Sequence, residues 1–240
     1  MEYIYRRVLL KLSGEALSNG GGKGPVDPDF LSVVADVIGR LVNDGVEVAV
    51  VTGGGNIIRG EGAKAFSRAR ADDMGMLSTV FNSIAVEDAL NSKGIKAVMM
   101  TAVEMNKIAP LFTVQKADEY LKSGYVVIIG GGTGNPYFST DTATVLRGCE
   151  INADAILLAK HVDGVYDKDP AKHPDAKKYT EITFDRMIRD ELTVIDIPSS
   201  CMAEKAGKTA ALFSLEDPYN ILRAAKGENP GTIIRSSKLK

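Results

Sequence analysis

Apolar residues cluster along this chain in short, dense runs, and longer segments with helical periodicity lie between them. The runs are "RVLLKLS" (7–13), "VEVAVVT" (46–52), "IKAVMM" (95–100), "YVVIIG" (125–130), "ADAILLA" (153–159), "LTVIDI" (192–197) and "KTAALFS" (208–214). Because most of them lack polar alternation, they predict strands that are buried on both faces of a largely parallel sheet.

Five segments between these runs predict the helices that would cover such a sheet. The segment 28–45 has Pro28 near its first turn and Gly45 past its end, and the segment 72–94 begins with an acidic pair and closes at Gly94. Shorter candidates span 114–123, 141–152 and 217–226. The alternation predicts an α/β fold, a three-layer αβα sandwich with a mainly parallel central sheet and right-handed crossovers.

Glycine-rich turns follow two of the predicted strands, in "VAVVTGGGN" (48–56) and "VVIIGGGTGNP" (126–136). In open parallel sheets the ligand crevice lies beyond the carboxyl ends of the strands, which is where these turns fall. Successive N–H groups of a glycine turn, together with the start of the next helix, form a concave anion site. A single turn of this kind is equally well explained as a tight strand-to-helix connection, but the pair favours a site for two phosphate groups.

The common nucleotide-binding fingerprints are absent. Neither Gly22–Lys23 nor Gly207–Lys208 follows the earlier glycine that a Walker phosphate loop requires. Ile58 and Asn135 occupy the positions where the dinucleotide fingerprint needs its third glycine. A nicotinamide cofactor is therefore not expected.

Composition and charge narrow the function further. The chain has 240 residues, so we expect a single domain over 1–240, and its formal charge of -2 provides no field that would attract nucleic acid or an anionic membrane. No apolar run approaches the 18 residues of a membrane span, and a cytoplasmic location is expected. Cys149 and Cys201 lie far apart and form no C-x-x-C pair, which predicts reduced thiols and no metal site.

Charged residues at strand ends are the first candidates for chemistry. Lys11 interrupts the first strand near its carboxyl end, where a buried ammonium needs a facing anion. The alternative is a lysine that reaches solvent from an edge strand, which the exposed turn Ser13–Gly14 directly after it disfavours. Asp196 ends the run 192–197 and could pair with or orient Lys11, or equally begin a helix before Pro198. For Asp141, helix capping is the better local interpretation.

Other polar residues lie close to the glycine turns. Arg59 is placed to neutralise a phosphate, with a surface arginine as the alternative. Asp72 and Asp73 begin a predicted helix, where one can serve the helix end and the other can bind ligand hydroxyls. His161 and His173 lie in loops without a nearby nucleophile pattern, and no catalytic role is expected for them.

Five segments together resemble one known family. They are "KLSGEAL" (11–17), "GGGNIIRG" (53–60), "DDMGML" (72–77), "GTGNPYFSTD" (132–141) and "VDGVYDKDP" (162–170). Their order and spacing resemble the bacterial type of uridylate kinase, within the amino acid kinase family, over nearly the whole chain. The resemblance implies a UMP kinase that catalyses ATP + UMP ⇌ ADP + UDP with Mg²⁺, as a cytoplasmic homohexamer in pyrimidine biosynthesis.

The resemblance also implies a role for individual residues. Its catalytic lysine and aspartate correspond to Lys11 and Asp196. The implied ATP-binding residues are Lys11, Leu12, Ser13, Gly14, Gly55, Arg59, Lys160, Tyr166 and Asp169. The implied UMP-binding residues are Gly54, Asp72, Thr133, Gly134, Asn135, Pro136, Tyr137, Phe138, Ser139 and Thr140. The N-terminal part would then form mainly the acceptor side and the C-terminal part mainly the ATP side.

One loop in this resemblance is linked to regulation. It corresponds to a segment associated with activation by GTP, and its residues are Asn19, Gly20, Gly21, Gly22, Lys23 and Gly24. GTP and UTP are therefore candidate effectors.

Two alternatives remain open at the level of sequence. An acyl-phosphate-forming relative, such as a carbamate, acetylglutamate or glutamate kinase, would share the glycine turns and Lys11, although "DDMGML" and "TGNPYFSTD" favour a nucleotide acceptor. A nucleotide-binding protein of the same fold without turnover is the second, and retention of both Lys11 and Asp196 disfavours it.

Overall fold

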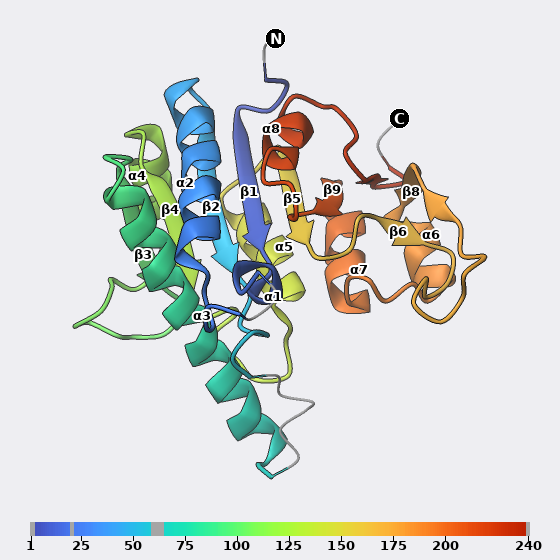
Figure 1. Ribbon diagram of the computed structural model, residues 1–240, viewed down its shortest axis with the longest axis horizontal. Coiled ribbons are helices and arrows are strands. Elements are labelled where there is room, and N and C mark those ends of the chain that lie inside the picture. Colours follow the sequence, from blue (N-terminus) through green and yellow to red (C-terminus); the bar gives the residue numbers. More distant parts are fainter. Residues whose placement is uncertain (1–2, 20–21, 59–64, 239–240) are drawn as a thin grey trace.

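An eight-stranded central sheet organises the computed structural model, which describes residues 3–19, 22–58 and 65–238 (Figure 1). The strand order is β3-β4-β2-β1-β5-β9-β10-β8. Their bounds are β1 Arg7–Leu12, β2 Glu47–Thr52, β3 Ala97–Thr101, β4 Val126–Gly130, β5 Ala155–Lys160, β8 Glu181–Thr183, β9 Thr209–Ser214 and β10 Thr232–Arg235. The pairs from β3 to β9 are parallel. β10 pairs antiparallel with β9 and parallel with β8, so β10 and β8 both run opposite to the other six strands. A separate antiparallel pair, β6 (Val165–Tyr166) and β7 (Lys178–Tyr179), lies outside this sheet.

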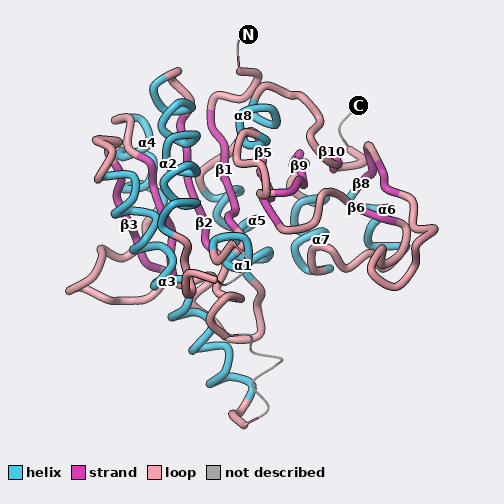
Figure 2. The backbone as a smooth tube through the Cα atoms, viewed as in Figure 1, coloured by secondary structure: helices cyan, strands magenta, loops and turns pink. Residues whose placement is uncertain are grey.

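Helices cover both faces of the sheet, as Figure 2 shows. They are α1 Gly14–Leu17, α2 Pro28–Asn43, α3 Arg68–Asn91, α4 Val114–Lys122, α5 Thr140–Glu150, α6 Phe184–Arg189, α7 Ile197–Lys205 and α8 Asn220–Ala225. Along β1, Val8 and Leu10 pack with α2, α3 and α8, whereas Leu9 faces a cluster that contains α4. Side chains from α5, α6 and α7 pack with β5 and β9 in a third cluster. The αβα sandwich and mainly parallel sheet predicted from the sequence are confirmed.

Six of the seven predicted strands are present, and the prediction for residues 192–197 is wrong. That segment forms turns and then begins α7, with Asp196 as the N-cap residue. Pro198, in the first turn of α7, lacks the N–H that a central strand would donate but is well suited to a helix start. The run is apolar because Ile195 is buried at the entry to the helix.

The helix predicted over 72–94 begins earlier than expected. α3 starts at Arg68, so Asp72 and Asp73 lie in its second turn and do not cap it. The first turns of α3 project beyond the body of the sheet (Figure 1), and the charged segment there carries no apolar period that could mark the true start. Asp72 is thereby brought beside the loop that follows β4.

None of the described helices is both long and apolar enough to span a membrane.

Candidate active site

The carboxyl ends of β4, β2, β1 and β5 surround a cavity of about 780 Å³. Since these four strands are adjacent and parallel, the turns that follow them meet at one edge of the sheet. Among the residues implied by the resemblance, those that line the cavity are Lys11, Ser13, Gly14, Gly54, Gly55, Asp72, Thr133, Asn135, Tyr137, Phe138, Ser139, Thr140, Lys160 and Asp196. Segments far apart in the sequence therefore converge on a single site.

Close approach of neighbouring backbone segments explains the glycines in the turn after β2. A Cβ on Gly14 would lie 2.8 Å from the carbonyl oxygen of Gly53, and one on Gly53 would lie 2.9 Å from the backbone nitrogen of Gly14. A Cβ on Gly54 would lie 2.7 Å from the carbonyl oxygen of Gly75 in α3. The turns after β1 and β2 and the helix α3 thus approach so closely that no side chain fits between them.

The glycine turn after β4 has a different cause. Gly131, Gly132 and Gly134 have φ values of +84°, +58° and +81°, a left-handed region that L side chains rarely adopt. The Gly134 N–H donates to the carbonyl of Gly131 at 2.9 Å and closes the turn. A Cβ on Gly132 would meet nothing within 4 Å, so this part of the turn is open.

Buried polar residues on α3 hold both glycine turns. The Thr79 hydroxyl accepts a hydrogen bond from the Gly131 N–H at 2.8 Å, and the Asn82 amide donates to the Gly53 carbonyl at 2.6 Å. The Ser83 and Thr52 hydroxyls hydrogen-bond to each other at 2.9 Å. Sequence analysis missed this stripe. Its signal is a set of small polar residues at helical spacing within an otherwise apolar segment, Ser78, Thr79, Asn82 and Ser83.

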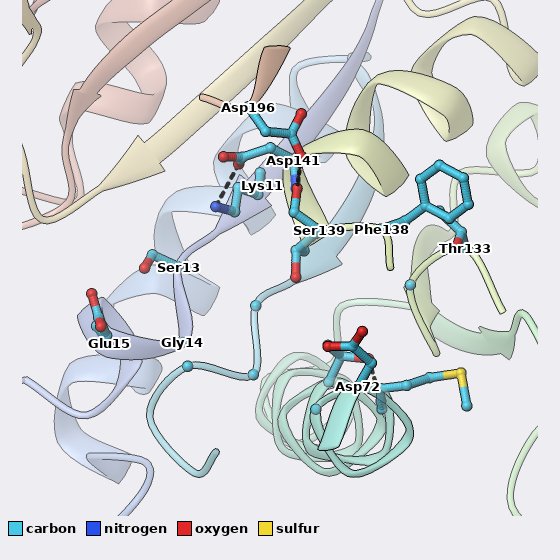
Figure 3. A pocket seen from close by; sticks show the side chains of 18 of the residues that line it. Lys11, Ser13, Gly14, Glu15, Asp72, Thr133, Phe138, Ser139, Asp141 and Asp196 are labelled. Atoms are coloured by element: carbon cyan, nitrogen blue, oxygen red, sulfur yellow. Dashed lines mark hydrogen bonds and ion pairs between the residues drawn. The ribbon is translucent and has the colours of Figure 1, made fainter. Parts of the chain in front are cut away.

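A buried cluster of two lysines and one aspartate lines the cavity, and Figure 3 shows two of its members, Lys11 and Asp141, facing each other. Lys11 Nζ lies 2.8 Å from Asp141 Oδ1, and Lys160 Nζ lies 2.8 Å from Asp141 Oδ2. The three side chains are 9%, 11% and 13% exposed, in the order Lys11, Lys160, Asp141. Two ammonium groups and one carboxylate give the cluster itself one net positive charge, and the Asp196 carboxylate of the same cavity interacts with Lys160.

The pKa values within this cluster reflect that arrangement. Burial disfavours the ionised form of Asp141, but the charges of Lys11 and Lys160 outweigh it and lower its pKa to about 2. For Lys160, burial first and the neighbouring Lys11 ammonium second lower the pKa to about 8, against the pull of Asp141. At neutral pH Asp141 is therefore ionised, and Lys160, with a pKa of about 8, is mostly protonated.

This cluster corrects two interpretations made from the sequence. Ser139 caps α5, accepting from the backbone N–H groups of Asp141 and Thr142, so Asp141 is not the cap but the partner of Lys11. Within the part of the chain that the structure describes, no ion pair joins Lys11 to Asp196. Local sequence favours capping for an aspartate near a helix start, and only the adjacency of β1 and β5 brings both lysines to it.

Asp196 instead connects the starts of two helices. Its Oδ1 accepts from the Ser199 N–H at 2.8 Å, and its Oδ2 accepts from the Thr142 hydroxyl at 2.8 Å and from the Ser139 hydroxyl. Figure 3 shows its carboxylate beside Ser139, close to Asp141. The helix-starting interpretation of Asp196 is confirmed, and the residue also lines the cavity.

Residues in the first turns of α3 contact the loop after β4 and hold it in place. The Tyr137 N–H donates to Asp72 Oδ2 at 2.9 Å, and Arg68 Nε donates to the same oxygen at 2.9 Å. The Arg68 guanidinium also lies 5.8 Å from the centre of the Tyr137 ring. Tyr137 has a φ of +69°, an uncommon value for a tyrosine, which these contacts help to maintain. Asp72 therefore faces the cavity from the side opposite Lys11 (Figure 3).

Several residues implied by the resemblance lie elsewhere. Tyr166 and Asp169 belong to the β6 region, where the Tyr166 hydroxyl donates to Asp163 and Asp169 pairs with Lys172. Those that do not contribute to the cavity wall in the described residues are Leu12, Gly134, Pro136, Tyr166 and Asp169. Arg59, Gly20 and Gly21 lie outside the described residues, while the described residues of the candidate effector loop are Asn19, Gly22, Lys23 and Gly24.

His161 has a place at the site that was not expected. It lines the cavity and its Nδ1 lies 3.5 Å from Glu15 Oε2, between the residue after β5 and the start of α1. Lys160 and His161 are consecutive, so the end of β5 contributes both the base of the cavity and part of its rim.

Cationic groups between two glycine turns, at the carboxyl ends of parallel strands, are typical of a phosphotransferase site. The comparison with known families agrees with this class of protein. Residues 6–212 match the model of the amino acid kinase family, to which the chain belongs. It is 46% identical to the uridylate kinase of Oenococcus oeni over 242 residues, which covers 99% of each chain. It is also 46% identical to the uridylate kinase of Aliarcobacter butzleri over 226 residues, 93% of this chain and 96% of that one.

Solved structures agree with these relatives. The UMP kinase of Bacillus anthracis superposes with a TM-score of 0.91 at 37% identity, covering 97% of both chains. The UMP kinase of Ureaplasma parvum gives a TM-score of 0.89 at 31% identity, covering 96% of this chain and 99% of that one. The resemblance to the uridylate kinase type within this family, drawn from sequence motifs, is confirmed.

Proposed function

We propose that this chain is a UMP kinase, which transfers the γ-phosphoryl group of ATP to UMP and releases UDP and ADP in pyrimidine nucleotide biosynthesis. Its near full-length similarity to uridylate kinases supports the substrate. The structural observation that carries the proposal is the buried Lys11–Asp141–Lys160 cluster between two glycine turns. It offers concentrated positive charge where two phosphorylated groups would meet.

Phosphoryl transfer requires that the two substrates are positioned and that the charge on the migrating group is neutralised; it requires little covalent chemistry from the protein. Lys11 and Lys160 would neutralise charge on the migrating group, and Asp141 holds the two ammonium groups side by side despite their repulsion. The phosphate of UMP is already ionised at neutral pH, so no general base is needed. The absence of a histidine within this cluster is consistent with that chemistry.

The positions of the turns support a donor side and an acceptor side in this proposal. ATP phosphates would contact the turn after β1, with Lys11, Ser13, Gly14 and Gly55, and the adenine nucleotide would extend toward Lys160, Tyr166 and Asp169. UMP would contact Gly54, the loop Thr133–Thr140 and Asp72, whose carboxylate can accept from ribose hydroxyls. Figure 3 shows Asp72 and Asp196 on different sides of the cavity that both line, which supports two opposed sides.

Mg²⁺ is the ion expected to accompany ATP. The site fits a magnesium ion that enters bound to the phosphates of the nucleotide. No cluster of three or more metal-binding side chains occurs among the described residues, and both oxygens of Asp141 already contact ammonium groups. Mg²⁺ is usually bound by substrate phosphates with one or two carboxylates. Asp196 also lines the cavity, but both of its oxygens accept hydrogen bonds from Ser139, Thr142 and Ser199, so the nucleotide phosphates would supply most of the ligands. When bound, the ion would neutralise charge on the phosphate oxygens.

In this proposal the enzyme is a cytoplasmic homohexamer with GTP or UTP as effectors. Leu77, Phe81 and Ile84 are exposed at helical spacing on one face of α3, which supports burial of that face in an assembly. Sedimentation should report a mass of about six chains, and a monomer at micromolar concentration would contradict this assembly. Addition of GTP or UTP to the assay tests the effectors directly.

A coupled assay for ADP tests the function. ATP and Mg²⁺ are supplied with UMP, CMP, dTMP, carbamate or acetylglutamate, and UMP should be the preferred acceptor. Absence of UMP-dependent ADP formation would contradict the proposal. Preference for carbamate or acetylglutamate would instead support an acyl-phosphate-forming relative.

A further inference from the structure

Arg147 is a buried cation that the proposed chemistry does not use. It lies on α5, its side chain is 9% exposed, and it does not belong to the cavity wall. Its Nε is buried and has no hydrogen-bond partner among the described residues. Since a buried charge and an unpaired donor both cost stability, such a residue calls for a reason beyond packing.

Three contacts fix the guanidinium in place. Its Nη1 donates to Glu150 Oε2 at 2.7 Å, and its carbon lies 4.5 Å from the centre of the Phe112 ring. Its Nη2 is directed at the carbonyl oxygen of Gly132, at 3.4 Å. Stacking on one side and an ion pair on another orient the planar group toward the glycine turn after β4.

The direction of the Gly132 carbonyl decides where the next N–H points. In a trans peptide unit the carbonyl and the following N–H point in opposite directions. Because the Gly132 carbonyl faces Arg147 beneath the turn, the Thr133 N–H faces the other way. Gly132 and Thr133 both line the cavity whereas Arg147 does not, which is the arrangement expected if the direction away from Arg147 leads into the cavity.

Other contacts fix the rest of the turn, since the Gly131 N–H donates to the Thr79 hydroxyl and the Gly134 N–H donates to the Gly131 carbonyl. Among the described residues, however, the Gly132 carbonyl accepts from Arg147 alone. Gly132 has a left-handed φ of +58° and its Cβ position is open, so no side chain of its own limits rotation of this peptide. Rotation of this peptide would direct the carbonyl into the cavity, where its partial negative charge would oppose an anionic nucleotide. Arg147 attracts that carbonyl in the opposite direction.

We propose that Arg147 is a positioning residue that holds the Gly132–Thr133 peptide with its N–H toward the cavity, and thereby sets the affinity for the acceptor nucleotide. The inference rests on the proposed function, because the acceptor is UMP. The ligand atom that the Thr133 N–H would meet is an oxygen acceptor of the nucleotide.

Steady-state kinetics of Arg147→Met test this role. The variant should raise the KM for UMP about tenfold, the effect expected from loss of one charge-assisted hydrogen bond, while the KM for ATP stays within about twofold. Arg147→Lys keeps the charge without the planar fork, so partial rescue to about a threefold increase is expected. Glu150→Gln is the matched control, since its amide oxygen can still accept from Arg147 Nη1 and keep the guanidinium oriented, and both KM values should change by less than about twofold.

A merely structural role would give a different pattern. Arg147→Met and Glu150→Gln would then both lower the denaturation midpoint and the active fraction, with both KM values unchanged, and that result would overturn the proposal. An equal rise in the KM values for UMP and ATP would also overturn it. If Arg147→Met does not fold, Arg147→Lys decides, and an unchanged KM for UMP in that variant counts against the role.

Amide hydrogen exchange supplies a second readout that requires no turnover. In Arg147→Met without nucleotide, the Gly134 N–H, which closes the turn on Gly131, should exchange about tenfold faster, whereas Ile128 in β4 should not change. Unchanged exchange at Gly134 would overturn the restraint. If wild-type protein forms no UMP-dependent ADP, the proposed function is wrong, and this measurement alone decides whether Arg147 holds the turn.

Discussion

Asp141→Asn is the change that most directly tests the buried charge cluster. The carboxylate contacts both Lys11 Nζ and Lys160 Nζ at 2.8 Å and is 13% exposed. A fall in the Asp141 pKa from 3.8 to about 2 corresponds to about 2 kcal/mol of folding free energy at neutral pH. Loss of the only negative charge in the cluster also leaves two buried ammonium groups facing each other, so we expect a total cost of about 3 kcal/mol.

The pH dependence of this variant has a defined sign. The wild-type Asp141 carboxylate, with its lowered pKa, contributes stability above its ordinary pKa of 3.8, and that contribution is lost as the pH falls toward about 2. Lys160 has a folded pKa of about 8 against 10.5 in the unfolded chain, so the unfolded state binds more protons between these values and stability rises with pH there. Without Asp141, the Lys160 pKa should fall further, and this rise should begin at a lower pH.

Urea denaturation of Asp141→Asn and wild type at pH 6, 7 and 8.5 measures both effects. Asp73→Asn is the control, because Asp73 pairs with the exposed Arg70 at 3.1 Å outside the cavity and should change stability by less than about 0.5 kcal/mol. A variant as stable as wild type at pH 7 would refute the reasoning. So would a stability difference that does not depend on pH between 6 and 8.5.

Other substitutions test separate parts of the site. Lys11→Ala should lower kcat about a thousandfold, since it removes a donor to the migrating phosphoryl group; near-normal turnover in the coupled assay would remove Lys11 from that role. Gly54→Ala should cost about 2 kcal/mol in urea denaturation because its Cβ would lie 2.7 Å from the Gly75 carbonyl oxygen. Gly132→Ala, whose Cβ meets nothing within 4 Å, should cost only about 1 kcal/mol for its left-handed backbone, and equal losses in the two variants would contradict this distinction. Ser139→Ala removes the α5 cap and should cost about 1 kcal/mol and raise the KM for UMP; an unchanged denaturation midpoint would show that the cap contributes little.

Periodicity was sufficient for most of the fold because buried parallel strands carry a strong local signal. The strands β1 and β4 were predicted within a residue of their bounds. Residues 192–197 were not, because an apolar run before a helix and a buried strand have the same composition. The start of α3 at Arg68 was missed for the opposite reason, since its first turns project from the sheet and need no apolar face.

Local sequence determined the fold class, the glycine turns and the presence of a lysine that needs an anion. It could not determine which anion, because Lys11, Asp141 and Lys160 are separated by 130 and 19 residues and meet only when β1 pairs with β5 at the edge where α5 begins. The glycines also have separate causes that are invisible in sequence: close packing at Gly53 and Gly54, and left-handed backbone at Gly131 and Gly132. A single segment of sequence shows which residue types it contains, whereas the partner of a buried charge depends on the order of the strands. Only the tertiary structure therefore decides how the site is assembled.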